Sequence, residues 1–507
     1  MRLPTIGSAQ LRSSAAVQSP GCIEPRSPAR PSPVGVVALL LAFAIASVVA
    51  IQGQEYSVCL AEPYVHALAD KGDAIKWTGI TFQRAALRDG HMLPIYGSSE
   101  FYNGYPNVPA VFFRNEPSGF DVFEVGQAGT EGLFFLETFG ALGNDLRGKK
   151  LVLSESPAWF LGNHQGRAAD YAGNFSPEIA EMFIFDSPIA LDLKEAGARR
   201  MLAYPTPLAD QPILRLAVLS LSGTKPLSPL GYFALYPVGR LDSEVRQLQD
   251  AWHTIQFIEA NPKLAESATA TIAPESPPDE AWWISQLATA TARQERDVGN
   301  DPFGFPPNIY NALRSNPDLH AAWLLYYTGG TNRDDEVYPS TDAWQENLET
   351  STAWQYLELE LSELHELGAK PFVYTVPLAG DYYNYTVVSR RNRLAYYHYF
   401  LTVAGKAHAP AVTFAQNDED RYFYIGPAGH FSQRGWVIAN RAIDLFWHGT
   451  SVTDLNAAID DLDRHVPPVG PAPRPPYITQ LQERAQEQRQ FATLHQTTPS
   501  RQASLRR

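Results

Sequence analysis

Five short apolar runs, separated by stretches of helical periodicity, constrain the fold of this chain more than any other feature. The runs have strand character and fall at 91–96, 121–125, 150–153, 371–376 and 411–414. Helical patterns lie between most of them, and parallel strands need crossover connections of this kind. The alternation predicts an α/β fold, with a doubly wound parallel sheet between layers of helices.

Small or polar residues follow each of these runs. Ser99 follows the first, Gly129 the second and Ser156 the third, while polar segments at 381–385 and 416–430 follow the last two. Ligands of open parallel sheets bind outside the carboxyl ends of the strands. We therefore expect these distant segments to meet along one edge of the sheet and to form a site there.

The end of the first run, Pro-Ile-Tyr-Gly-Ser-Ser-Glu at 94–100, is the main candidate for chemistry. A strand that ends abruptly in small polar residues presents a hydroxyl at the sheet edge, beside backbone N–H groups. Such a turn suits a nucleophilic Ser99, because the same N–H groups stabilise a developing oxyanion. The alternative is an ordinary turn or a helix N-cap, which this pattern also forms.

An apolar segment without charge, at 34–51, precedes the first run. The Ser-, Pro- and Ala-rich stretch before it is basic, and it predicts a disordered cytoplasmic tail at 1–33. A single-pass transmembrane anchor at 34–52 would leave the N-terminus in the cytoplasm and the body outside the cell membrane. A cleaved signal peptide with a long leader is the alternative.

The body is expected at 53–450, and helical patterns replace the strand series within it at 161–341. This helical insertion either covers the sheet edge or forms a wall of a substrate groove or a docking surface for a membrane partner. After the body, residues 451–507 are expected to be a Pro-rich linker and a polar tail.

Charge and cysteine usage exclude several classes of protein. Lys plus Arg number 40 and Asp plus Glu 54, so the net charge of −14 argues against nucleic acid as a partner. Cys22 and Cys59 lie on opposite sides of the apolar segment. We therefore expect no disulfide framework and no thiolate metal site, and neither a metal nor a cofactor is predicted.

Four blocks of residues resemble the DltD family of D-alanine transfer proteins, which is itself similar to SGNH (GDSL-like) hydrolases. They occur in the family's order, with the last block in two parts: GSSE at 97–100, VGQAGT at 125–130, KKLVLSESPAWF at 149–160, then KPFVYTVPLAGDYYNYT at 370–386 and GHFSQRGW at 429–436. The resemblance spans roughly 34–449. It implies the three-layer, flavodoxin-like sheet of SGNH hydrolases.

The resemblance also implies roles for residues at the expected sheet edge. Ser99 would be the nucleophile, and His430 would be the general base that takes its proton. The backbone N–H groups of Ser99 and Gly129 would be the oxyanion donors.

Two positions depart from the family pattern. The family places an Asp three residues before the histidine to orient the imidazole, and this chain has Pro427 there. Either the site works as a Ser–His dyad, or a nearby acid substitutes, with Asp418 and Asp420 as the closest candidates in sequence. Ala158 stands where the family often carries a polar residue, which removes a side-chain donor from that block.

The function that the resemblance implies is an extracytoplasmic serine acyl transferase, moving D-alanyl or another acyl group onto an envelope polymer such as teichoic acid. Its implied partners are a membrane-bound O-acyltransferase, an acyl carrier or acyl-lipid donor, and the acceptor polymer. Two alternatives stay open: an SGNH-type esterase or thioesterase, and a non-catalytic subunit that positions the acyltransferase, which Pro427 motivates.

Overall fold

The structure is a computed structural model. It describes residues 33–102, 104–116, 118–130, 132–160, 168–223, 228–267, 278–298, 341–383, 389–425 and 430–470. The chain divides into two units, Met1–Val49 and Ala50–Arg507. The predicted tail at 1–33 lies almost wholly outside the described residues, as do Cys22, Pro427 and residues 471–507.

The core of the second unit is a five-stranded parallel sheet with the strand order β2-β1-β3-β4-β5. The strands are β1 Met92–Tyr96, β2 Asp121–Val125, β3 Lys150–Glu155, β4 Lys370–Thr375 and β5 Ala411–Val412. The predicted α/β class and parallel sheet are therefore confirmed. Every residue of β1 and β2 is buried, because helices cover both faces of the sheet.

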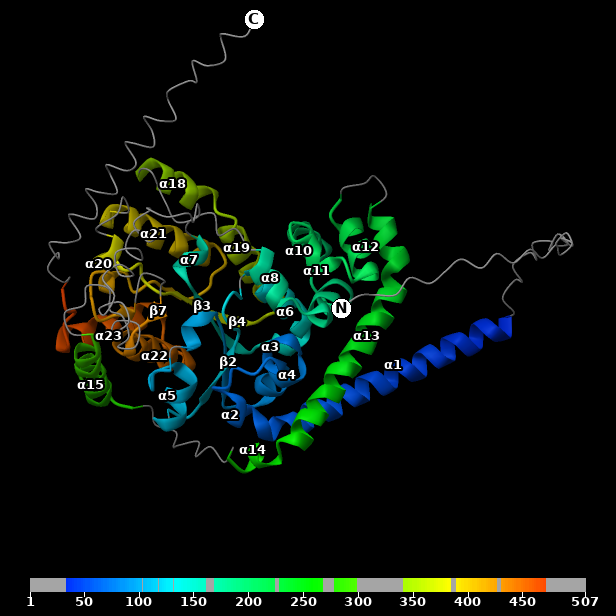
Figure 1. Ribbon diagram of the computed structural model, residues 1–507, viewed down its shortest axis with the longest axis horizontal. Coiled ribbons are helices and arrows are strands. Elements are labelled where there is room, and N and C mark those ends of the chain that lie inside the picture. Colours follow the sequence, from blue (N-terminus) through cyan, green and yellow to red (C-terminus); the bar gives the residue numbers. More distant parts are fainter. Residues whose placement is uncertain are drawn as a thin grey trace, which may run out of the picture. The chain divides into compact units, whose positions relative to one another are not determined.

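Helices pack on the two faces of this sheet (Figure 1). One layer contains α5 Pro109–Asn115, which contacts β2 and α22 Gln433–Trp447. The other contains α6 Gly132–Leu142, α19 Ala353–Glu366 and α21 Arg390–Lys406, which contact one another in that order. Aromatic side chains connect the layers to the sheet, as where the ring of Phe372 stacks on that of Phe446.

The first helix, α1, runs from Pro33 to Ala61 and includes the apolar segment that the sequence marks as an anchor. In the second unit, its last turns bury Val58 and Ala61. Gln54 on these turns donates a hydrogen bond to Gln247 over 2.5 Å. Within the described residues, no helix combines the length and the apolar character needed to cross a membrane.

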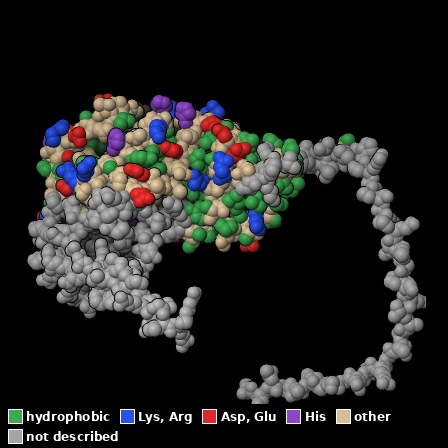
Figure 2. All heavy atoms as spheres, turned by 90° about the horizontal axis from the view of Figure 1, so that it is seen from above, with side chains coloured by type: hydrophobic (Ala, Val, Ile, Leu, Met, Phe, Trp, Pro, Cys, Tyr) green, Lys and Arg blue, Asp and Glu red, His purple; other side chains and the backbone are tan. Residues whose placement is uncertain are grey.

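The described part of the predicted insertion at 161–341 is built from helices. They are α8 Ala168–Asn174, α9 Pro177–Glu181, the π-helical turn η4 Met182–Asp186, α10 Leu191–Met201, α11 Pro205–Leu208, α12 Pro212–Leu221, α13 Ser228–Ala260, α14 Pro262–Ser267 and α15 Glu280–Val298. Figure 2 shows hydrophobic side chains gathered on the surface of this region. The exposed apolar residues of α12 and α13 include Leu216, Leu230, Phe233 and Val238.

Short elements complete the described structure. They are η1 Glu62–Tyr64, α2 Val65–Leu68, α3 Ile75–Thr78, α4 Thr81–Arg88, η2 Ser99–Tyr102, η3 Gly143–Leu146, α7 Pro157–Phe160, α18 Thr341–Thr350, α20 Gly380–Tyr383, η5 Ala415–Asn417, β6 Tyr424–Ile425 and β7 His430–Phe431.

The expected linker from 451 begins instead with a helix, α23 Val452–His465. Its buried residues Leu455, Ile459 and Leu462 form an apolar stripe, and the helix packs against α22. The folded body therefore extends past residue 450, because this stripe completes the core beside α22.

Candidate functional site

The turn after β1 is held close to the turn after β2 by glycines. Gly126 has a φ of +134°, and a Cβ on it would lie 1.9 Å from the carbonyl oxygen of Gly97. A Cβ on Gly97 would lie 2.4 Å from Glu100 Oε1. Both positions need glycine because backbone and buried side chains already occupy that space.

Hydrogen bonds then fix the second turn to the first. Thr130 Oγ1 donates to the carbonyl oxygens of Gly97 and Gln127, over 2.6 and 2.7 Å. Ser98 Oγ donates to Gln127 O over 3.2 Å, and it accepts from the backbone N–H of Gly129 over 3.2 Å. The turns after β1 and β2, two of the segments expected to meet, therefore lie together at the carboxyl edge of the sheet.

Ser99 and His430 are brought into direct contact at this edge. Ser99 begins η2, directly after the turn, and its Oγ lies 2.9 Å from His430 Nε2. His430 belongs to β7, which pairs with β6 in a small antiparallel ribbon. The next side chain, Phe431, is fully buried and packs against Tyr374 and Trp436, which anchors the ribbon to the core.

The imidazole of His430 is arranged to accept a proton. Burial lowers its pKa from the ordinary 6.5 to about 4, so the ring is neutral at physiological pH. A neutral imidazole whose Nε2 carries a lone pair accepts the hydrogen bond of the Ser99 hydroxyl. This is the geometry that a serine nucleophile and its general base require.

Neither Asp418 nor Asp420 contacts His430. Asp418 accepts a hydrogen bond from Arg393 Nε over 2.9 Å, and Asp420 accepts one from Arg434 Nε over 2.6 Å. All four side chains are almost completely buried, so the two ion pairs act as structural braces of the loop before β6. Across the described ranges, no carboxylate forms an ion pair with His430.

The backbone N–H of Gly129, one of the two expected oxyanion donors, already has a partner in this state. It donates to Ser98 Oγ, and Gly129 has a φ of +85°. The hydroxyl of Ser98 therefore occupies the direction that an oxyanion would take on this N–H. The oxyanion roles of Ser99 and Gly129 stay predictions. In the described residues, no group of three His, Cys, Asp or Glu side chains is placed to hold a metal ion.

Two buried carboxyls beside the serine had no assigned role in the sequence interpretation. Glu100, the residue after Ser99, is fully buried, and its Oε1 accepts a hydrogen bond from Ser154 Oγ over 2.7 Å. Burial raises the pKa of Glu100. Glu155, at the end of β3, is also buried. In the sequence, acidic residues at or just after the ends of apolar strands could have pointed to these two carboxyls, since acidic groups are seldom buried without a reason.

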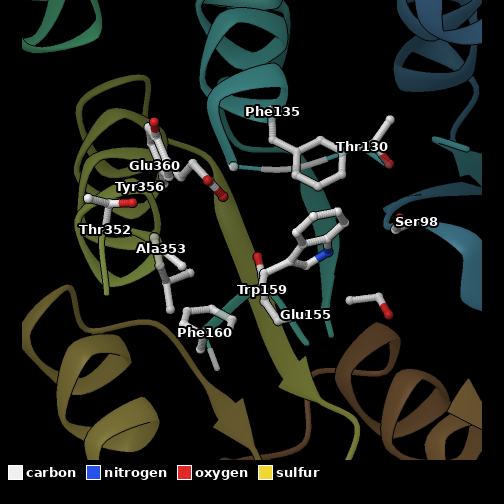
Figure 3. A pocket seen from close by; sticks show the side chains of 13 residues that line it. Ser98, Thr130, Phe135, Glu155, Trp159, Phe160, Thr352, Ala353, Tyr356 and Glu360 are labelled. Carbon is white, nitrogen blue, oxygen red and sulfur yellow. The ribbon is translucent and has the colours of Figure 1, made fainter. Parts of the chain in front are cut away.

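A small pocket of about 20 Å³ lies next to the serine turn. Its described lining is Ser98, Thr130, Gly132, Phe135, Ser154, Glu155, Trp159, Phe160, Thr352, Ala353, Tyr356, Leu357 and Glu360. Figure 3 shows the residues of α19 on one side, Ser98 and Thr130 on the other, and Trp159 and Glu155 between them. The pocket therefore lies between Ser98 of the serine turn and residues of α6 and α19.

Comparison with known proteins gives matches to one family. A sequence model of the DltD family, described as DltD protein, matches residues 73–448. Protein DltD of Bacillus subtilis (strain 168) is 25% identical over 421 residues, which cover 82% of this chain and 97% of that protein. Protein DltD of Staphylococcus aureus is 20% identical over 365 residues, covering 72% and 83%. Since the match includes the serine turn, the pocket and His430, the chain belongs to the DltD family.

Proposed function

We propose that this protein is a serine acyl transferase of D-alanine transfer, acting on the outer side of the cell membrane. The observation that carries the proposal is the 2.9 Å contact between Ser99 Oγ and His430 Nε2 at the carboxyl edge of the sheet. Membership of the DltD family supports D-alanyl as the acyl group.

The proposed reaction has two halves. In the first, Ser99 Oγ attacks the carbonyl carbon of an acyl ester or thioester while its proton passes to His430 Nε2. The bond from the carbonyl carbon to the leaving oxygen or sulfur breaks, and the leaving group takes the proton from His430. In the second half, a hydroxyl of the acceptor gives its proton to His430 Nε2 and attacks the carbonyl carbon of the acyl-serine. The bond from that carbon to Ser99 Oγ breaks, and Ser99 Oγ takes the proton back from His430.

The proposed partners follow from the need for a donor and an acceptor. We propose a membrane-bound O-acyltransferase that supplies the acyl group from an acyl carrier or acyl lipid, and an envelope polymer that accepts it. The exposed apolar side chains of α12 and α13 support a surface that meets such a partner, since patches of this kind mark interaction sites.

Attachment to the membrane through residues 34–52 stays a prediction that depends on the sequence alone. It is tested by fractionation of cells that produce the full chain. We expect the full chain in the membrane pellet after an alkaline wash. Deletion of residues 34–52 should remove the protein from that pellet.

The central test is labelling of the full chain with a serine-directed fluorophosphonate. Ser99→Ala should abolish labelling and His430→Ala should lower its rate, by roughly 10²–10⁴-fold for loss of a general base. The exposed Ser362 on α19 provides a matched control, and Ser362→Ala should label like the native chain. Labelling that survives in Ser99→Ala would overturn the proposal.

A second candidate function is a non-catalytic subunit that positions the acyltransferase. The observation that favours it is that, within the described residues, no carboxylate is paired with His430. In this case Ser99→Ala would restore ester-linked D-alanine in cells that lack the protein, whereas an active transferase would not tolerate the change. If the site is instead that of a hydrolase, the protein should cleave small acyl esters in water without an acceptor.

A further inference from the structure

The carboxyl group of Glu155 is the most unusual feature of the pocket. The residue is 7% exposed, and its side chain has no hydrogen-bond partner among the described residues. It lines the pocket together with Ser98, the direct neighbour of the nucleophile. Buried carboxyl groups are nearly always paired, so an unpaired one that faces a cavity points to a partner that a ligand supplies.

The rest of the lining suits a cation. A second buried carboxyl, that of Glu360 on α19, lines the same pocket. The rings of Phe135, Trp159 and Tyr356 supply aromatic walls. Aromatic faces attract ammonium groups, and the described lining contains no Lys, Arg or His that would oppose a positive charge.

The protonation of Glu155 agrees with this arrangement. Burial and the neighbouring carboxyl of Glu100 raise the pKa of Glu155 to about 8, so the group is largely neutral at pH 7. The titratable groups around it are Glu100 from η2, Glu360 from α19 and Tyr396 from α21. Deprotonation of Glu155 is thus costly until a positive charge enters the pocket.

We propose that this pocket binds the ammonium group of a small aminoacyl unit, with the Glu155 carboxylate as its hydrogen-bond acceptor. The inference rests on the proposed function, because it names the part of the acyl group that the site recognises. An aminoacyl ester carries an ammonium two bonds from the carbonyl carbon that Ser99 attacks. The cavity measures about 20 Å³, which is room for one group the size of a water molecule and therefore suits an ammonium group.

The test separates binding from chemistry by use of the Ser99→Ala chain. Binding of D-alaninamide and of propionamide, which lacks only the amino group, is measured by titration followed by NMR or calorimetry. D-Alaninamide should bind at least about tenfold more tightly, as expected for a charge-assisted hydrogen bond in a buried site. Equal affinity for the two amides would overturn the proposal.

Variants of Glu155 then identify the acceptor. In the Ser99→Ala background, Glu155→Gln should remove the preference for the amine, whereas Glu155→Asp, which keeps the charge, should restore part of it. The exposed Glu358 on α19 is the matched control, and Glu358→Gln should keep the full preference. Far-ultraviolet circular dichroism and thermal melting show that each variant is folded.

The outcomes distinguish this inference from the proposed function. If fluorophosphonate fails to label Ser99 but the amine preference depends on Glu155, the acyl transfer is wrong and the ammonium site stands. If Ser99 is labelled and Glu155→Gln keeps the preference, the acyl transfer stands and the ammonium site is overturned.

Discussion

Ser99 Oγ and His430 Nε2 lie 2.9 Å apart although 331 positions separate the two residues in the chain. The turn after β1 supplies the hydroxyl, and the β6–β7 ribbon supplies the imidazole. Glycines and Ser98 hold the turn that carries Ser99, and the buried Phe431 holds the ribbon that carries His430. The predictions below therefore concern the residues that hold Ser99 and His430 in place as well as these two residues.

The first prediction concerns the pH dependence of Ser99 labelling. His430 accepts a proton only when neutral, and burial places its pKa at about 4. The labelling rate should be level from pH 8 down to about pH 5 and fall by half near pH 4. The measurement is the rate of fluorophosphonate labelling against pH, with circular dichroism to show that the chain stays folded. A half-maximal rate near pH 6.5 would mean that the imidazole is not desolvated.

The second prediction tests Asp420 as a brace of the fold. Asp420→Asn leaves the fully buried Arg434 without its closest carboxylate and should lower the free energy of unfolding by roughly 2–4 kcal/mol, since Asp463 still faces the guanidinium. Urea denaturation measures the loss, and the exposed Asp460→Asn serves as the control. Full stability together with loss of Ser99 labelling would instead make Asp420 part of the catalytic machinery.

The third prediction concerns the contact between the two turns. Gly126→Ala places a Cβ 1.9 Å from Gly97 O at a φ of +134°, so the turns must separate. We expect a loss of roughly 2 kcal/mol or more in stability and slower labelling of Ser99. Gly173→Ala, in the open on α8, should be neutral or stabilising because a Cβ there has no atom within 4 Å. Similar unfolding curves for the two variants would contradict the close approach.

The fourth prediction is a pH dependence of stability from His66. Its ring nitrogens lie 2.9 Å from Asp121 Oδ2 and 3.0 Å from Asp89 Oδ2, and these bonds raise its pKa to about 9. A raised pKa contributes stability that is fully present below the unfolded value of 6.5 and is lost as the pH rises through 9. The free energy of unfolding should thus fall by up to about 3 kcal/mol between pH 6 and 10.

Substitution isolates this effect. His66→Gln should flatten the alkaline part of the stability curve, while His398→Gln, on the exposed face of α21, should leave it unchanged. An equal alkaline loss in His66→Gln would assign the dependence to other groups.

Local patterns in the sequence were sufficient for the sheet and for the serine turn. Apolar runs that end in small polar residues, and helical periodicity between them, gave strands within a few residues of those observed, because burial on both faces leaves a continuous apolar signal. The helix α23 was missed because its three apolar residues stand among many polar ones, as in a solvated tail. Their burial depends on packing against α22, which the local sequence does not show.

Contacts between residues distant in sequence decided the other features of the site, because the energy of a buried charge depends on such neighbours. Proximity along the chain suggested Asp418 and Asp420 for His430, yet Arg393 and Arg434 take both carboxylates within the folded body. Residue order alone does not distinguish Glu155 from any acidic residue at a strand end. Its lack of a partner appears only when β3, α6 and α19 enclose it beside the serine turn. Residue types and spacing thus determined which groups could react, and packing decided which of them meet and which are kept from water.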